Sequence, residues 1–139
     1  MGSAIKRGKN STVAGEKSRG RVLVVDDEAL IRWSVGTALE SAGYDVLEAR
    51  DGAAARLQAA ESSAIDFAVL DLRLPDIDGV TLLEEIRSSH PECRFLIMTA
   101  FRSPALASRP ALADVPIVDK PFSIPELVHV VDRAIGTRG

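Results

Sequence analysis

Short apolar runs recur along the chain after residue 20 and predict the strands of a sheet. They lie at 22–25, 45–49, 67–70, 95–98 and 116–118, and most of them are unbroken by polar residues. An unbroken run of this length is typical of a strand that is buried on both faces of a parallel sheet. The chain is therefore expected to form five such strands.

Helical periodicity fills most of the intervals between these runs. Apolar residues spaced three or four apart predict helices over 30–43, 52–60 and 80–89, and a fourth helix that begins near Pro125. The interval 99–115 is different, because Pro104 and Pro110 each remove an amide donor and restrict the preceding residue. A short or broken helix is expected there. Strands that alternate with helices predict an α/β fold with a parallel sheet and right-handed crossovers.

Composition agrees with one folded domain. The chain has 139 residues, of which 46% are hydrophobic and 27% are charged, and this length suits a single domain. No apolar run approaches the roughly 20 residues that span a bilayer, and the N-terminus lacks the apolar core of a signal peptide. Cys93 is the only cysteine, which excludes an internal disulfide and a multi-cysteine zinc site. These features indicate a cytoplasmic protein.

Charge is divided unevenly along the chain. Residues 1–21 carry six basic side chains and one acidic, whereas the other 118 residues carry 11 basic and 19 acidic. Residues 1–20 are rich in Gly, Ser and Lys, and we interpret them as a disordered basic tail. Part of this tail has the composition of residues that are added by an expression vector. The body, 21–139, is too acidic to bind nucleic acid through a general positive field. Lys120 is its only lysine.

Polar side chains stand where the predicted strands end. Asp26 and Asp27 follow the first strand, Asp71 ends the third, Thr99 ends the fourth and Lys120 follows the fifth. Ligand sites in open parallel sheets lie beyond the carboxyl ends of the strands. Each residue alone has an ordinary explanation, such as a helix cap or a solvated charge. Their joint occurrence at four strand ends predicts one shared site.

The chemistry of this group suits phosphoryl transfer. Three clustered carboxylates repel one another unless a cation joins them, and hard oxygen ligands suit Mg²⁺. An ammonium and a hydroxyl are the groups that stabilise a transferring phosphoryl group. No histidine or cysteine stands at a strand end to act as nucleophile, so a carboxylate is left, and Asp71 is the central candidate.

Four motifs resemble those of receiver (response regulator) domains of two-component signalling. They are VLVVDDE at 22–28, VLDLRLPDIDG at 69–79, IMTA at 97–100 and DKPF at 119–122. The wording of the second and third motifs is most similar to receivers of nitrogen-regulator-type transcriptional regulators. The resemblance covers residues 21 to about 136. It implies a flavodoxin-like, doubly wound, five-stranded parallel sheet of order 2-1-3-4-5 with helices on both faces.

The resemblance also implies a role for each site residue. Asp71 would accept the phosphoryl group in a Mg²⁺-dependent reaction and later lose it to water, which makes the protein a signalling phosphoacceptor rather than an enzyme. Asp27, Asp71 and the backbone carbonyl of Arg73 would bind Mg²⁺ directly, and Asp26 largely through water. Lys120 would pair with a phosphoryl oxygen, and its peptide bond to Pro121 would be cis. Thr99 would donate its hydroxyl to the phosphoryl group on activation.

The sequence departs from the family pattern at the switch. Receivers usually carry an aromatic residue three positions before the lysine, and here that residue is Ile117. Leu112 and Ala113 replace a usual Gly-Ala pair, and two prolines interrupt 99–115. We therefore expect intact phosphorylation chemistry with an altered output. One hypothesis is that 100–116 is a mobile loop whose ordering is the readout.

The expected partners are a sensor histidine kinase or phosphotransfer protein, and an output domain or protein that contacts residues 100–135. A second copy of the chain is a further candidate partner, and no membrane contact is expected. The main alternative is a pseudo-receiver, an interaction module of the same fold without a phosphorylation-dependent switch. A haloacid-dehalogenase-type phosphohydrolase is disfavoured, because Arg73 occupies the position of its general acid. A nucleotide-binding Rossmann domain is disfavoured too, because no glycine-rich loop follows the first strand.

Overall fold

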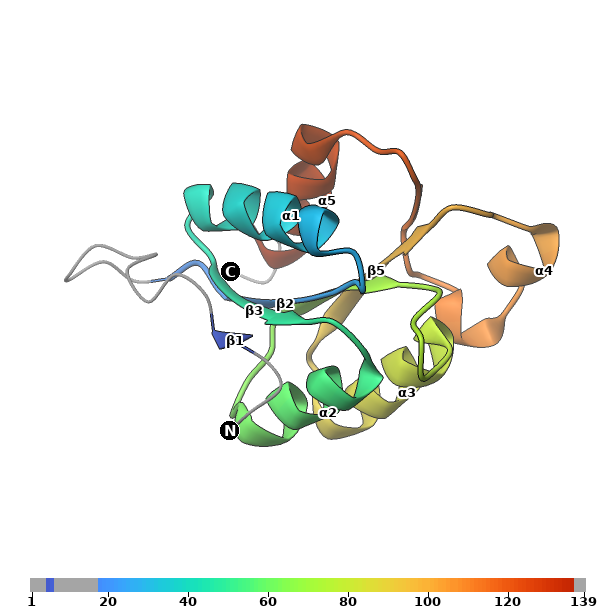
Figure 1. The fold of residues 1–139 in the computed structure, drawn as a ribbon, viewed down its shortest axis with the longest axis horizontal. Helices are drawn as coiled ribbons and strands as arrows, with labels where there is room; N and C mark the ends of the chain where they lie inside the picture. Colours follow the sequence, from blue (N-terminus) through green and yellow to red (C-terminus); the bar gives the residue numbers. More distant parts are fainter. Residues whose placement is uncertain (1–4, 7–17, 137–139) are drawn as a thin grey trace.

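A six-stranded sheet forms the centre of the computed structural model, which describes residues 5–6 and 18–136 (Figure 1). The strands are β1 (Ile5–Lys6), β2 (Arg21–Val25), β3 (Asp45–Ala49), β4 (Phe67–Asp71), β5 (Arg94–Thr99) and β6 (Ile117–Asp119). Their order across the sheet is β1-β3-β2-β4-β5-β6. The five strands from β2 to β6 are parallel, so the predicted order 2-1-3-4-5 is confirmed.

Helices cover both faces of the sheet (Figure 1). They are α1 (Ala29–Ser41), α2 (Gly52–Glu61), α3 (Gly79–Ser89), α4 (Pro104–Ala107) and α5 (Ile124–Gly136), with a 3₁₀ helix η1 (Pro110–Leu112). Helices α1 and α5 pack on one face, and α2 and α3 pack on the other. Within the described part of the chain, no helix has the length and apolar character needed to cross a bilayer.

Alternating side chains of the central strands build two cores, one on each face. Along β2, Val22 and Val24 pack under α1 and α5, whereas Leu23 and Val25 pack under α2 and α3. All four are completely buried. This double burial explains why the strand is an unbroken apolar run, and it fixes the register of the strand against its neighbours.

The fourth crossover contains only short helical pieces, as the two prolines predict. Pro104 lies at the start of α4, where a missing amide donor costs nothing, and the hydroxyl of Ser103 accepts the N–H of Leu106 at 3.2 Å. Pro110 begins the 3₁₀ helix. Leu106 and Leu112 are the buried apolar anchors of this segment. The carboxyl end of the sheet is therefore bordered by a loop-rich segment.

The N-terminal segment contributes one strand that the apolar pattern did not predict. Ile5 and Lys6 pair antiparallel with Glu48 and Leu47 at the edge of the sheet. A strand of two residues is too short to produce a recognisable alternation. Most of the predicted tail, residues 1–4 and 7–17, lies outside the described residues. Ser18 to Gly20 lead directly into β2, and the guanidinium of Arg19 lies 3.0 Å from the carboxylate of Asp132 in α5.

Candidate functional site

Three aspartates meet at the carboxyl ends of β2 and β4. One carboxylate oxygen from each of Asp26, Asp27 and Asp71 lies within 4.8 Å of the others. Asp26 and Asp71 are buried, whereas Asp27 is exposed. β2 and β4 are adjacent parallel strands, so residues that follow or end them must lie at the same edge of the sheet. The structure thus brings together the carboxylates that the strand ends predict.

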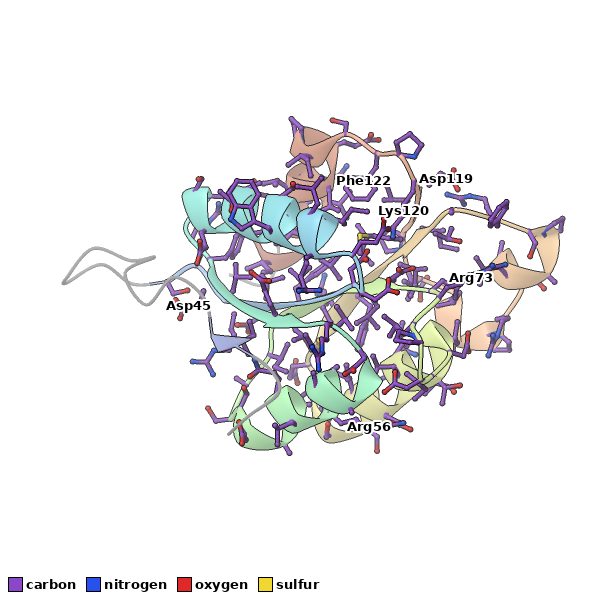
Figure 2. The ribbon with its side chains drawn as sticks, viewed as in Figure 1. Asp45, Arg56, Arg73, Asp119, Lys120 and Phe122 are labelled. Atoms are coloured by element: carbon purple, nitrogen blue, oxygen red, sulfur yellow. The ribbon has the colours of Figure 1, made fainter. Side chains whose placement is uncertain are left out.

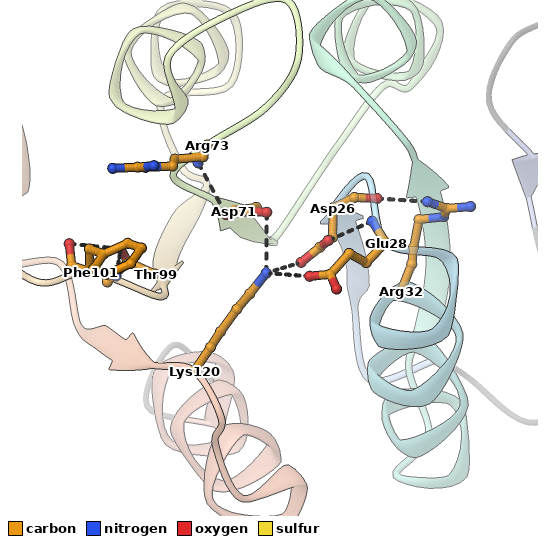
Figure 3. A network of polar contacts seen from close by, with 8 residues as sticks. All are labelled: Asp26, Glu28, Arg32, Asp71, Arg73, Thr99, Phe101 and Lys120. Atoms are coloured by element: carbon orange, nitrogen blue, oxygen red, sulfur yellow. Dashed lines mark hydrogen bonds and ion pairs between the residues drawn. The ribbon is translucent and has the colours of Figure 1, made fainter.

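The ammonium of Lys120 lies among the carboxylates of Asp26, Glu28 and Asp71 (Figure 3). Its Nζ donates to Asp26 Oδ2 at 2.8 Å, to Asp71 Oδ2 at 3.2 Å and to Glu28 Oε1 at 3.3 Å. The Lys120 side chain is only 13% exposed. Glu28 is a site residue that the sequence pattern did not single out, although it closes the acidic run that begins at Asp26. Figure 2 shows Lys120 and Arg73 at the same end of the sheet, opposite the end that carries Asp45.

Burial and the contacts between Lys120 and the carboxylates have opposite effects on the pKa values of Asp26 and Lys120. Burial raises the pKa of Asp26, and the nearby Asp71 carboxylate raises it further, against the lowering effects of Lys120 and of the Glu28 N–H. Burial alone would lower the pKa of Lys120, but its contacts with Asp26 and Asp71 outweigh burial and raise that pKa above its usual value. Lys120 therefore stays protonated, while the ionised form of Asp26 is disfavoured.

Backbone and side-chain contacts fix the position of Asp26. Its Oδ1 accepts the N–H of Glu28 at 2.8 Å, and its carbonyl oxygen accepts Nη1 of Arg32 at 2.6 Å. The same guanidinium pairs through Nε with Glu48 at 3.2 Å. Arg32 thereby links the end of β2 to α1 and β3. The Asp26 carboxylate is held in the site before any ligand arrives.

Asp71 is held by the loop that follows β4. Its Oδ1 accepts the N–H of Arg73 at 3.1 Å, so the carboxylate is turned back over its own strand end. Gly79, the first residue of α3, presses against this turn, and a Cβ on Gly79 would lie 2.5 Å from the Asp71 carbonyl oxygen. Any larger residue at this position would displace the strand end. Gly79 is required for close approach rather than for an unusual backbone angle.

Thr99 is buried at the end of β5, but its hydroxyl contacts its own loop. Thr99 Oγ1 donates to the Phe101 carbonyl at 3.1 Å and accepts the Phe101 N–H at 3.0 Å. The Phe101 ring is 68% exposed, and the guanidinium of Arg73 lies over it at 5.1 Å from the ring centre (Figure 3). The hydroxyl thus stands next to the site while its hydrogen bonds go to Phe101. No sequence motif indicated the Arg73–Phe101 contact.

Ile117, at the usual aromatic position of the switch, is partly buried and packs against the core under α2 and α3. Its carbonyl accepts Nη2 of Arg102 at 2.5 Å, and Nε of the same arginine pairs with Asp119 at 3.1 Å. Arg102 therefore ties the loop after β5 to β6. The peptide bond between Lys120 and Pro121 is cis, in agreement with the resemblance.

Comparison with known proteins decides the family. Residues 22–132 match the family model of the response regulator receiver domain. The chain belongs to the response regulator receiver family. Receivers of this family act in two-component signalling, where they interact with histidine kinases and output domains, and they are signalling phosphoacceptors rather than classical enzymes.

Similar receivers occur in several larger regulators. The chain is 39% identical over 118 residues to the DNA-binding transcriptional regulator NtrC of Escherichia coli K12, covering 84% of this chain and 25% of NtrC. It is 35% identical over 116 residues to the sensor kinase CckA of Brucella abortus, covering 82% of this chain and 12% of CckA. The receiver thus spans a quarter of the first relative and about an eighth of the second.

Solved structures confirm the receiver fold. A response regulator receiver protein from Sinorhizobium medicae superimposes with a TM-score of 0.78 at 26% identity, over 86% of this chain and 97% of that one. The BeF3-activated receiver domain of DrrB gives a TM-score of 0.73 at 26% identity, over 84% and 97% of the two chains. Each likeness extends over nearly the whole of the solved receiver.

The donor set of this receiver fits a hard divalent cation. Asp26, Asp27 and Asp71 supply only carboxylate oxygens, and the Lys120 ammonium pairs with two of them, Asp26 and Asp71. Oxygen ligands of this kind, partly open to water through the exposed Asp27, suit Mg²⁺, which retains several of its own waters. The residues present are therefore compatible with the magnesium that the family implies.

Proposed function

We propose that Asp71 accepts a phosphoryl group from the phosphohistidine of a sensor kinase or a phosphotransfer protein. A carboxylate oxygen of Asp71 attacks phosphorus, the bond between phosphorus and the histidine nitrogen breaks, and the histidine leaves as neutral imidazole after protonation. The observation that carries this assignment is the position of Asp71 Oδ2, 3.2 Å from the Lys120 ammonium inside a cluster of carboxylates. Hydrolysis of the resulting acyl phosphate by water would return the free carboxylate and inorganic phosphate.

Mg²⁺ is the cofactor in this proposal. Asp27, Asp71 and the carbonyl of Arg73 would hold it directly, and Asp26 would contact it largely through water. When bound, the ion neutralises the negative charge that builds up on the oxygens of the transferring group. All of these proposed Mg²⁺ ligands come from β4 or from the loops that follow β2 and β4, at the edge of the sheet where the three aspartates meet.

Lys120 would stabilise the phosphorylated state. Its pKa is raised by its carboxylate partners, so the side chain carries its positive charge at physiological pH. On phosphorylation the ammonium would exchange its hydrogen bond with Asp71 Oδ2 for one with a phosphoryl oxygen. The ammonium would thus keep a charge-assisted hydrogen bond in both states, and in the phosphorylated state it would balance negative charge on the phosphoryl oxygens.

Thr99 would connect the site to the output segment. To donate to the phosphoryl group, the Thr99 hydroxyl must give up its hydrogen bond to the Phe101 carbonyl. The loop after β5 would then lose one of its attachments, while Arg102 still ties it to Ile117 and Asp119. Because Ile117 has no ring to swing inward, rearrangement within 100–116 is the proposed readout.

The output partner would contact the surface formed by residues 100–135, and a second copy of this chain is a further candidate for that contact. Residues 21–139 would act as the receiver, with the basic residues of 1–20 outside it. NtrC is named as a DNA-binding transcriptional regulator. By analogy, this receiver would control an output module rather than bind nucleic acid with its own acidic body. The similar DrrB receiver domain is BeF3-activated, and this likeness supports phosphorylation-dependent activation here.

Intact-mass spectrometry tests this proposal. The chain is incubated with acetyl phosphate in the presence and absence of Mg²⁺, and the expected product is one Mg²⁺-dependent phosphoryl adduct. Asp71→Asn is expected to abolish the adduct. Asp78→Asn is the matched control, because Asp78 lies in the same loop and caps α3, a role that asparagine also fills. Without any adduct, or with an equal adduct on Asp71→Asn, the pseudo-receiver alternative would replace the proposal.

A further inference from the structure

A cavity lies at the amino ends of the strands, opposite the phosphorylation site. It has a volume of about 510 Å³ and is bounded by α3, the first residues of β5, the loop before β6 and α5. The volume falls in the range of roughly 300–1,000 Å³ that is usual for small-molecule sites. None of the residues assigned to the phosphorylation site lines this cavity.

The cavity exists because β6 is shorter than β5. β6 begins to pair only at Ile97, so the first three residues of β5 have no β6 neighbour. The N–H of Ile97 donates to the Pro116 carbonyl, and the Thr99 carbonyl accepts the N–H of Lys120. Every second residue of a strand directs its backbone N–H and C=O to the same neighbouring strand, so the backbone groups of Phe95, like those of Ile97 and Thr99, point to the β6 side. Pro116 has no amide hydrogen to offer the Phe95 carbonyl, so pairing stops at this point.

The floor of the cavity is apolar. Phe67 and Phe95 are buried strand residues that line it from opposite faces of the sheet. Val130 of α5 lies on the face of Phe67, and Val115 of the loop before β6 lies on the face of Phe95. On each face an aromatic ring and a branched side chain make a surface that suits the hydrophobic body of a ligand.

Three arginines surround this floor. Arg87 stacks over the Phe95 ring at 5.3 Å and donates Nη1 to the Ala111 carbonyl at 3.1 Å, which holds its guanidinium in place. Arg94 and Arg133 also line the cavity, and within residues 18–136 neither makes an ion pair or a side-chain hydrogen bond. Among the described residues, Asp114 is the single acidic side chain that lines the cavity. The net charge of the side chains that line the cavity is therefore positive.

We infer that this cavity binds a small amphipathic organic anion, a carboxylate with a hydrophobic ring or chain. The apolar body would lie against Phe67 and Val130, on the face of the sheet that α5 covers. The carboxylate would pair with the guanidinium groups of Arg94, whose β-strand partner is Phe67, and of Arg133 in α5. Arginine is suited to this role, because its planar fork of N–H donors matches the two oxygens of a carboxylate. This site is independent of Asp71, so its test does not depend on phosphorylation.

Titration of the ¹⁵N-labelled chain with 1-naphthoate, followed by NMR, tests the site. The neutral analogue 1-naphthalenemethanol has a similar shape and serves as the ligand control. We expect saturable shifts confined to the residues around the cavity, with a dissociation constant on the order of 1 mM or tighter. Binding of the neutral analogue is expected to be about tenfold weaker.

The double variant Arg94→Gln/Arg133→Gln is expected to weaken naphthoate binding about tenfold or more. Both side chains are exposed, so the fold should be retained. Arg50→Gln is the matched control, because Arg50 is an exposed arginine of the described chain that does not line the cavity. The inference is overturned by three outcomes: no saturable shift, equal affinity for the neutral analogue, or unchanged affinity in the double variant.

Discussion

The hydroxyl of Thr99 and the backbone of Phe101 hold each other through two hydrogen bonds, of 3.1 and 3.0 Å. The hydroxyl of Thr99, a buried residue at the end of β5, is thus hydrogen-bonded to the loop that follows the strand. In the proposed phosphorylated state the same hydroxyl is needed at the site. Thr99 can serve only one of these acceptors at a time, so phosphorylation and loop attachment compete for it.

Replacing Thr99 with alanine is expected to uncouple the loop from the site. The variant loses both hydrogen bonds, which we expect to lower the free energy of unfolding by about 1–2 kcal/mol. Amide hydrogen exchange across 100–116 should be faster than in the parent chain and should no longer respond to beryllofluoride with Mg²⁺. Thr99→Ser retains a hydroxyl and should respond like the parent. If the parent shows equal protection of 100–116 with and without beryllofluoride, this segment is not the readout.

Lys120→Ala should leave the fold intact while impairing the site. Lys120 contacts three carboxylates, so its removal leaves them to repel one another, and we expect a loss of about 2–3 kcal/mol in the free energy of unfolding without metal. Mg²⁺ should then bind several-fold more tightly, because no ammonium competes for the oxygens. Calorimetric titration with Mg²⁺ measures this change. Arg109→Ala removes a cation whose ion-pair partner among residues 18–136 is Asp78, and it should leave Mg²⁺ affinity unchanged. Weaker Mg²⁺ binding to Lys120→Ala would contradict the argument.

Asp26→Asn is expected to stabilise the metal-free protein and to weaken Mg²⁺ binding. The folded-state pKa of Asp26 is raised, chiefly by burial, so its ionised form opposes folding at neutral pH. Removing that charge should increase the free energy of unfolding at pH 7. The difference should shrink as the pH falls through the folded-state pKa, because the parent carboxyl then becomes neutral too. Denaturant unfolding of the parent and of Asp26→Asn, from neutral pH into acid, measures this difference in the free energy of unfolding. A difference that grows as the pH falls would refute the prediction.

Gly79→Ala should damage the site through the backbone. The new Cβ would lie 2.5 Å from the Asp71 carbonyl oxygen, so β4 or α3 must shift. We expect a loss of about 1–3 kcal/mol in stability and a reduced yield of phosphoryl adduct. Gly136→Ala is the control, since nothing lies within 4 Å of a Cβ at that helical position. Equal stability and equal adduct yield in both variants would show that Gly79 does not position Asp71.

The arrangement of the site was predictable because it follows from topology. Strands buried on both faces produce unbroken apolar runs, and parallel strands bring Asp26 and Asp71 to one edge whatever the loops do. The contacts of Phe101 and Arg102 were not predictable, because they depend on how the loop after β5 folds. The contact between Glu28 and Lys120 depends on the side-chain conformation of Glu28, which the sequence does not reveal. The cavity at the amino ends depends on where β6 begins, which a three-residue strand does not reveal in sequence.

The most direct test of the account is to locate the phosphoryl group. Phosphorylation by acetyl phosphate with Mg²⁺, followed by borohydride reduction, converts an aspartyl phosphate to homoserine. Tryptic cleavage after Arg56 and Arg73 then releases peptide 57–73, which contains both Asp66 and Asp71. We predict homoserine at Asp71 alone, and only when Mg²⁺ is present. Homoserine at Asp66 or in another peptide, or no conversion in peptide 57–73, would contradict the assignment of Asp71 as the phosphoacceptor.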